Sequence, residues 1–341
     1  MNDSSQTENQ PPARSVTVVI AAYNASVTIA RAVRSALAEP EVAEVIVVDD
    51  GSNDGTSSCA GNADDGSGRL RILLQPSNGG PSAARNRAIC ESRAPWIAVL
   101  DSDDFFLPGR ICGLLACATN ADLVADDMWQ VPESDVDGPR KSLFSEALKE
   151  PRLVSFSEFV LWNVTDRKRP RAELGFIKPL MRRDFLAQHS LRYQEHMRLG
   201  EDYELYARAL ALGARLKLIP VQGYVSVVRD NSLSGRHTET DLLHLLECDH
   251  AIGQLSGLRA PDKDALRRHY GSIDCRLQWR LLIMAVKRGD WSACRAGFAR
   301  PYPVPFYLLA RLAERAIPRK ALKLRRAIMA RIPVLQRKPV H

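Results

Sequence analysis

The sequence predicts an α/β fold, in which a mostly parallel sheet is flanked by helices and followed by a helical C-terminal extension. Three observations support this prediction. Apolar runs rich in valine and isoleucine alternate with segments of helical periodicity in the first third of the chain. Three of these runs end in polar or acidic residues. From about residue 236 onward the pattern is helical.

Four short apolar segments are predicted to be strands: 15–23, 42–50, 69–75 and 95–101. A helix is predicted between the first two strands, over residues 26–39, with Ser26 as a candidate N-cap. A second helix is predicted from about Pro81, since proline suits the first helical position. Strands that alternate with helices form βαβ units, so this order indicates parallel pairing.

The remaining elements follow in chain order. Pro108 is predicted to open a helix, and residues 121–129 to form a strand that precedes a loop at 132–142. The apolar positions of "EDYELYARALALG" share one face, which predicts a helix from Glu201. We divide the chain into a disordered tail, an α/β domain and a basic helical region: 1–14, 15–235 and 236–341.

The charge and composition of the chain indicate which kinds of molecule it can bind. The 341-residue chain carries a formal net charge of +7 and has an isoelectric point near 9.1, which favours an anionic partner. It has no RNP, KH or zinc-finger signature, so we expect no nucleic-acid partner. The seven cysteines contain no C-x-x-C pair, which predicts reduced thiols in a cytosolic protein and argues against a zinc site. Neither a signal peptide nor a membrane span is expected.

Polar side chains follow three of the predicted strands. They are Tyr23 and Asn24, then Asp49 and Asp50, then Asp101, Ser102, Asp103 and Asp104. The carboxyl ends of parallel strands share one edge of a sheet, where ligands bind. A single Asp-rich turn is more often only a turn, but two on one edge predict a cleft whose acids need a cation. Mg²⁺ or Mn²⁺ suits carboxylate oxygens.

The segment "GGPSAARNRAI" adds positive charge near this edge. Arg85 and Arg87 lie in the opening turns of the predicted helix, and both arginine and helix N-termini suit anionic ligands. The alternative for Arg85 is a surface ion pair. The P-loop, the dinucleotide fingerprint and the G-x-S-x-G elbow are all missing from the sequence.

Together these motifs resemble family 2 glycosyltransferases of the GT-A fold. The resemblance covers residues 15–235 and rests on "VVIAAYN", "VIVVDDGSNDGT", "GGPSAARN", "VLDSDD" and "LGEDYELYARAL". A narrower resemblance, to bacterial succinoglycan-type exopolysaccharide glucosyltransferases, implies transfer of glucose with inversion from a UDP-sugar to a growing lipid-linked oligosaccharide. The alternatives are a sugar-nucleotidyltransferase, whose Gly-rich phosphate loop is missing, and a glycosyltransferase that acts on a protein or small molecule.

The resemblance also implies roles for single residues. Those assigned to the nucleotide sugar are Tyr23, Asn24, Asp50, Arg85, Asp101 and Ser102, with Tyr23 and Asp50 at the uracil ring. Asp202 matches the catalytic base, with Glu201 beside it, and Asp103 matches the metal ligand. Asp49 is expected to be a structural acid.

Two departures from the family pattern concern the same cleft. Ala21 stands where the family has a proline, which affects the stiffness of the turn. The histidine common after the position of Tyr224 is missing. Either Arg229 replaces it as a phosphate contact, or His237 supplies a metal ligand.

A basic segment ends the chain. Between residues 311 and 338 there are ten basic residues and one acid, interleaved with leucine and isoleucine: Arg311, Glu314, Arg315, Arg319, Lys320, Lys323, Arg325, Arg326, Arg331, Arg337 and Lys338. Basic amphipathic helices bind anionic membrane surfaces. We therefore expect a cytoplasmic protein that is peripheral at the inner face of the membrane. The alternative is an ordinary solvated helix.

Overall fold

The structure is a computed structural model that describes residues 14–144, 148–164, 174–229 and 237–316. These residues form two compact units, one that ends at Tyr270 and one that begins at Gly271. Residues 1–13 of the predicted tail and most of the basic segment lie outside the described residues. The division predicted near residue 236 coincides with the change from strands to helices, and its status as a domain boundary stays a prediction.

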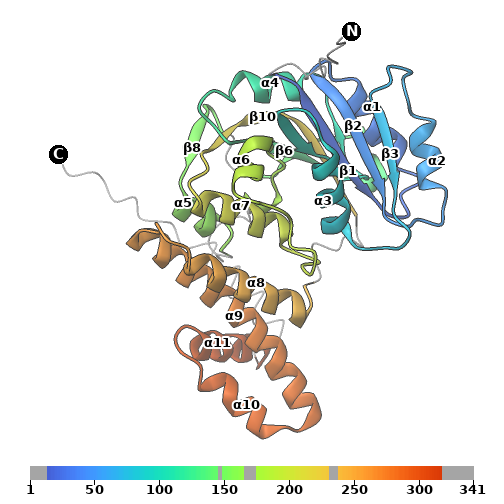
Figure 1. The fold of residues 1–341 in the computed structure, drawn as a ribbon. Coiled ribbons are helices and arrows are strands. Elements are labelled where there is room, and N and C mark those ends of the chain that lie inside the picture. The colour runs from blue at the N-terminus through green and yellow to red at the C-terminus, as the bar shows by residue number, and fades with distance from the viewer. Residues whose placement is uncertain (1–13, 145–147, 165–173, 230–236, 317–341) are drawn as a thin grey trace, which may run out of the picture. The chain divides into compact units, whose positions relative to one another are not determined.

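The first unit holds the strands that the structure describes (Figure 1). They are β1 (Val16–Ala22), β2 (Val42–Asp49), β3 (Leu70–Leu74), β4 (Trp96–Val99), β5 (Phe105–Phe106), β6 (Leu123–Pro132), β7 (Lys141–Ser142), β8 (Arg152–Val154), β9 (Leu180–Arg182) and β10 (Leu216–Val228). Its helices are α1 (Ile29–Leu37), α2 (Thr56–Gly61), α3 (Pro81–Glu91), α4 (Arg110–Ala116), η1 (Glu133–Asp135), α5 (Phe156–Trp162), η2 (Leu174–Phe176), α6 (Arg183–Gln188), α7 (Glu201–Ala211), α8 (Glu239–Gly253) and the first part of α9 (Ala260–Arg288).

The described strands form one ten-stranded sheet, with the order β3-β2-β1-β4-β9-β6-β10-β5 and with β7 and β8 added beside β6 and β10. The α/β prediction is confirmed. Pairing is parallel among β3, β2, β1 and β4 and between β6 and β10. The strands β5, β7, β8 and β9 pair antiparallel, so the whole sheet is mixed. These four strands have two or three residues each, too few to show a periodicity in the sequence.

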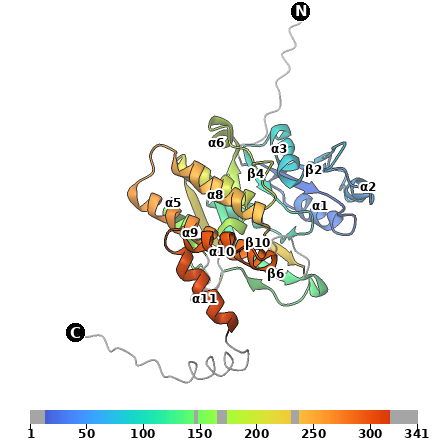
Figure 2. The same cartoon turned by 90° about the horizontal axis from the view of Figure 1, so that it is seen from below.

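The central strands are buried on both faces, which explains their continuous apolar sequence. Val18 and Ile20 of β1 lie in one hydrophobic cluster with Ile29 and Val33 of α1. The helix α3 covers the other side, so that α1 and α3 lie on opposite sides of β2 (Figure 2). The parallel strands therefore direct their carboxyl ends to one edge.

The start of α1 differs from the prediction. Its N-cap is Thr28, and the predicted cap, Ser26, is wrong. The backbone N–H of Ser26 donates to Oδ2 of Asp54 at 3.0 Å. Ser26 therefore belongs to the loop after β1, which is hydrogen-bonded to the loop after β2. The helix α1 begins only after this first loop.

The second unit contains the rest of α9, α10 (Trp291–Phe298) and α11 (Val304–Ala316). Its hydrophobic core consists of Cys275, Trp279, Leu282, Ala285, Cys294, Val304 and Leu308. Arg300 is paired with Asp274 at 2.8 Å. Among the helices that the structure describes, none combines the length and the apolar character needed to cross a bilayer.

Candidate active site

The loops after β1 and β2 are joined by hydrogen bonds. Asn24 adopts a left-handed backbone with φ 48°, a conformation that asparagine tolerates better than most residues. Its N–H donates to Oγ of Ser52 at 2.9 Å, and its Oδ1 accepts from the N–H of Asn53 at 3.1 Å. The side chain of the adjacent Tyr23 is 51% exposed. The loops thus present an accessible aromatic ring on an ordered backbone.

The two acids at the end of β2 have different partners. Asp49 accepts a hydrogen bond from the N–H of Ser52 at 2.9 Å, which holds the turn. Asp50 accepts from the N–H groups of Gly79 and Gly80, each at 2.8 Å, and also contacts the side-chain amide of Gln75. Asp50 therefore fixes the glycine turn that leads into α3. A carboxylate has about four acceptor positions, and three donors already contact the buried Asp50.

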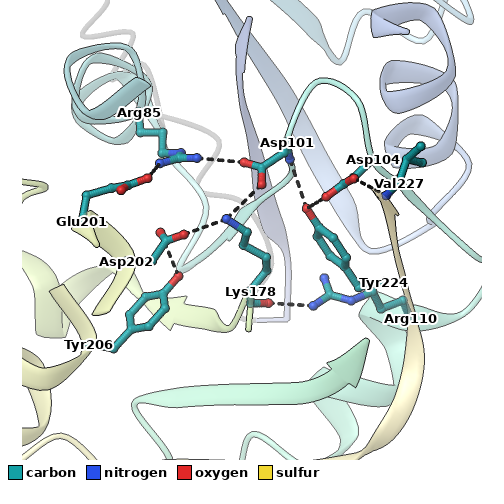
Figure 3. Close-up of polar contacts among 10 residues, drawn as sticks. All are labelled: Arg85, Asp101, Asp104, Arg110, Lys178, Glu201, Asp202, Tyr206, Tyr224 and Val227. Atoms are coloured by element: carbon teal, nitrogen blue, oxygen red, sulfur yellow. Dashed lines mark hydrogen bonds and ion pairs between the residues drawn. The ribbon is translucent and has the colours of Figure 1, made fainter. Parts of the chain in front are cut away.

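Arg85 joins the end of β4 to the start of α7 (Figure 3). Its Nη2 lies 2.8 Å from Oδ1 of Asp101, and its Nη1 lies 2.9 Å from Oε1 of Glu201. The side chain is 7% exposed, so the surface ion pair considered from the sequence is not what forms. Asp101 and Glu201 are a hundred residues apart in the chain, and this one guanidinium brings them together.

The start of α7 requires an unusual backbone. Gly200 is the N-cap residue, with φ 84° and no side-chain cap. A Cβ there would lie 2.6 Å from Cδ2 of Leu245 on α8. Glu201 and Asp202 follow in the first turn, where the helix dipole favours negative charge. The predicted helix with two acids at its N-terminus is confirmed.

Lys178 is a site residue that the sequence did not reveal. Its Nζ lies 3.0 Å from Oδ2 of Asp101 and 2.7 Å from Oδ2 of Asp202 (Figure 3). The side chain is 8% exposed. The backbone carbonyl of Lys178 accepts from Nη2 of Arg110 at 2.6 Å, and Arg110 is itself paired with Asp126. The only signal in the sequence is one lysine within the apolar run "GFIKPLM".

These ion pairs set the protonation of the acids. Burial alone would raise the pKa of Asp101, but Lys178 and Arg85 hold it well below the usual range. Burial, followed by repulsion from Asp202, raises the pKa of Glu201. Two neighbouring acids therefore differ in character, since Asp101 stays ionised while Glu201 takes up a proton more readily.

Asp103 and Asp104 lie at the end of the same acidic turn. Asp104 is buried and accepts from the hydroxyl of Tyr224 and the N–H of Val227, each at 2.8 Å. Oδ2 of Asp103 lies 3.3 Å from Nη2 of Arg229. Burial and repulsion from Asp101 raise the pKa of both acids. Ser102, between Asp101 and Asp103, is half-buried.

Arg229 and His237 were the two candidates to replace the missing histidine after Tyr224. Of these, Arg229 contacts Asp103 in the acidic turn. His237 precedes Thr238, the N-cap of α8. In this turn and at the start of α7, carboxylates outnumber the cationic side chains. Burial raises the pKa of Asp103, and repulsion from Asp101 raises it further, so a cation bound there would relieve that repulsion. The carboxylate of Asp103 thus fits Mg²⁺ or Mn²⁺ as an oxygen ligand. Both oxygens of Asp101 are instead paired with Arg85 and Lys178.

Comparison with known proteins shows which family the chain resembles. Residues 17–183 match the family described as Glycosyl transferase family 2. The succinoglycan biosynthesis protein ExoU of Rhizobium meliloti (strain 1021) is 46% identical over 301 residues, which cover 88% of this chain and 87% of that protein.

Two solved structures share the fold. S. aureus TarS 1-349 in complex with UDP-GlcNAc has a TM-score of 0.60 at 18% identity, and the match covers 82% of this chain and 89% of that one. The mannosyltransferase PcManGT from Pyrobaculum calidifontis, in complex with GDP-Man and Mn²⁺, has a TM-score of 0.56 at 17% identity, and the match covers 91% of this chain and 82% of that one. The chain has the GT-A fold and belongs to glycosyl transferase family 2.

Proposed function

We propose that this chain is an inverting glycosyltransferase that transfers glucose from UDP-glucose to a lipid-linked oligosaccharide during exopolysaccharide assembly. The observation that carries the proposal is the contact of Asp202 with Lys178, which also contacts Asp101. A candidate base is thus held beside the acidic turn that receives the donor. The similarity to ExoU supports the exopolysaccharide role, and the fold shared with TarS bound to UDP-GlcNAc supports a UDP-sugar donor.

The nucleotide is assigned to the loops after β1 and β2. Tyr23 has an exposed ring that can stack on uracil. Asp50 has acceptor capacity left for the ring N–H of the base. Asn24 orders the loop that carries Tyr23, and we assign Asp101 and Ser102 to the ribose and sugar, as the family resemblance implies. Arg85 contributes by holding Asp101 in position.

A divalent ion, Mg²⁺ or Mn²⁺, would be held by Asp103. When bound, such an ion neutralises the negative charge that develops on the departing diphosphate. The Mn²⁺ in the PcManGT complex supports the use of a metal in this fold. Arg229, which contacts Asp103, supplies a further positive charge for the diphosphate.

Asp202 is the proposed general base. The acceptor hydroxyl oxygen bonds to the anomeric carbon from the side opposite the diphosphate, its proton passes to the Asp202 carboxylate, and UDP leaves as the glycosyl–phosphate bond breaks. Base assistance of this kind accelerates a reaction by about 10²–10⁴-fold. Lys178 and the hydroxyl of Tyr206, 3.4 Å from Oδ1, orient the carboxylate.

The deciding experiment is a screen of nucleotide sugars with a lipid-linked oligosaccharide acceptor, read as UDP release and as product anomeric configuration by NMR. The proposal expects UDP-glucose to be the best donor and the product to have inverted configuration. Retained configuration would exclude Asp202 as a single-step base, and preference for a GDP-sugar would exclude the uracil assignment.

We also propose a membrane contact by the second unit. On α11, Phe306 and Leu309 are 67% and 56% exposed, while Val304 and Leu308 are buried. Tyr302, two residues before the helix, is 82% exposed. The helix α11 therefore has a second apolar side that its own unit does not cover. Arg311 and Arg315 follow on this helix, but their guanidinium groups lie over the ring of Trp279 in the core of the unit. The other eight basic residues of the segment lie outside the described residues. An exposed apolar side, on a helix that is followed in the sequence by a basic segment, suits an anionic bilayer surface.

A further inference from the structure

We propose that His196, His244 and Glu247 form a zinc site, built from residues other than the carboxylates around Asp103. Each of the three side chains offers one ligand atom, and these atoms all lie within 4.8 Å of one another. Within the described part of the chain, no other group of three histidine, cysteine or acidic side chains meets this criterion. Two imidazoles and one carboxylate are a donor set that zinc accepts. Mg²⁺ and Mn²⁺ instead prefer oxygen ligands, so the two sites differ in chemistry.

The backbone brings the three side chains together. His244 and Glu247 are three residues apart on α8, so they lie on one face of that helix. His196 comes from the segment that precedes Gly200. That segment is held against α8 by the ion pair between Arg198 and Asp241, 2.5 Å long. The ligands therefore come from two pieces of backbone that are already joined.

The two rings have an orientation that suits a shared ion. Their centroids are 4.9 Å apart, and their planes are nearly perpendicular, at 88°. With zinc–nitrogen bonds of about 2.0–2.1 Å and a tetrahedral angle, two ligating imidazoles have ring centres about 5 Å apart. Small rotations of His196 and His244 would bring one nitrogen of each ring to the same ion.

A second observation points to a ligand. Nδ1 of His244 is buried and has no hydrogen-bond partner among the described residues. A buried polar atom without a partner is unfavourable, and it is normally satisfied by protein, water or an ion. His196 and Glu247 are exposed, so an ion can reach the position from solvent. A bound zinc would satisfy the His244 nitrogen and leave one coordination position for water.

The site would act on the catalytic helix through the backbone. His196 is four residues before Gly200, where the turn into α7 begins. A zinc ion shared with His244 and Glu247 would tie this segment to α8, in addition to the Arg198–Asp241 pair. We expect zinc to raise the thermal stability of the full chain, because an ion that binds only the folded state stabilises it.

The test uses the full chain after chelator treatment and removal of the chelator. Zn²⁺ is titrated by calorimetry in excess Mg²⁺, which occupies the oxygen site, and Co²⁺ is then used as a spectroscopic probe. The expected result is one equivalent of zinc, a visible absorption typical of tetrahedral Co²⁺, and a higher melting temperature. His196→Ala and His244→Ala should each weaken zinc binding at least tenfold. His250→Ala, an exposed histidine elsewhere on α8, should bind like the wild type.

Wild-type zinc affinity in both His196→Ala and His244→Ala would overturn the proposal, as would a wild-type protein that binds no stoichiometric zinc. Because His196 is exposed, we expect the His196→Ala variant to fold, so that a loss of zinc affinity in it reports on the site itself. An octahedral Co²⁺ spectrum would also count against the site, because it would indicate oxygen ligands.

Discussion

The ammonium nitrogen of Lys178 lies 2.7 Å from Oδ2 of Asp202, and the same nitrogen reaches Asp101. Replacing Lys178 with Met should leave both buried carboxylates without this cation. Breaking a buried pair in this way costs about 3–5 kcal/mol, and we expect turnover to fall as Asp202 loses its position. Thermal unfolding and steady-state kinetics measure the two effects. Lys178→Arg keeps the charge and should recover part of the stability.

The same substitution has a predictable pH dependence. Lys178 and Arg85 depress the pKa of Asp101, so this acid stabilises the fold above the pKa it has when unfolded, about 3.9. That contribution is lost as the pH falls through the lower pKa of the folded state. The stability difference between wild type and Lys178→Met should therefore be largest above about pH 4 and should shrink below it. A difference that grows on acidification would contradict the assignment.

Asp202→Asn keeps the shape of the side chain but cannot accept a proton. We expect turnover to fall at least about 10²-fold, with donor affinity nearly preserved. Glu201→Gln is the matched control, since Glu201 is adjacent and contacts Arg85. If Glu201→Gln abolishes turnover and Asp202→Asn does not, the two roles are reversed.

Removal of the metal should stop transfer. Asp103→Ala should lose nearly all activity and most of its affinity for Mn²⁺, measured by calorimetry without turnover, because Asp103 is the proposed oxygen ligand. Asp49→Ala, an acid that contacts Ser52 instead, should keep its Mn²⁺ affinity. Full activity of the wild type in excess EDTA would remove the metal from the mechanism.

Asp50→Ala should weaken UDP binding more than Asp49→Ala does. Asp50 also holds the turn at Gly79 and Gly80, so a weaker affinity alone does not establish contact with uracil. The ratio of UDP to GDP affinity separates the two effects. Loss of a uracil contact lowers that ratio, whereas a loosened turn weakens both nucleotides alike and would leave Asp50 as a structural residue.

The double substitution Phe306→Ser and Leu309→Ser should reduce binding to liposomes that contain anionic lipid. Truncation before α11 is a poorer test, because it also removes the buried Val304 and Leu308. Trp291→Ser, an exposed aromatic residue on α10, is the matched control and should bind as the wild type does. Added salt should release the wild-type protein, since it screens the basic residues. Unchanged sedimentation of the folded double variant would exclude this surface.

Much of the first unit could be predicted because its signals are local. The continuous apolar run of β2 and the proline at the start of α3 each identify their element without tertiary information. The acids at the strand ends were expected to converge because parallel strands share an edge. The structure brings Asp101 together with Glu201 and Asp202 through Arg85 and Lys178.

The rest depended on contacts between distant parts of the chain. Lys178 has no periodic pattern around it, and its importance comes from acids that lie on two other elements. A helix was predicted from Pro108, but nothing in its pattern indicates that Arg110 is fully buried and donates to the Lys178 carbonyl. The strand β9, with three residues, was too short to predict.

The hydrogen bonds that join Asn24 to the side chain of Ser52 and to the backbone N–H of Asn53 have a thermodynamic consequence. Ordering the backbone of one residue costs about 1–2 kcal/mol of conformational entropy. In this protein the two loops are already ordered when the chain has folded, before a nucleotide binds. Donor binding then has little loop disorder left to remove. A larger share of the contact enthalpy can appear as affinity, and the two loops should resist amide hydrogen exchange even in the ligand-free protein.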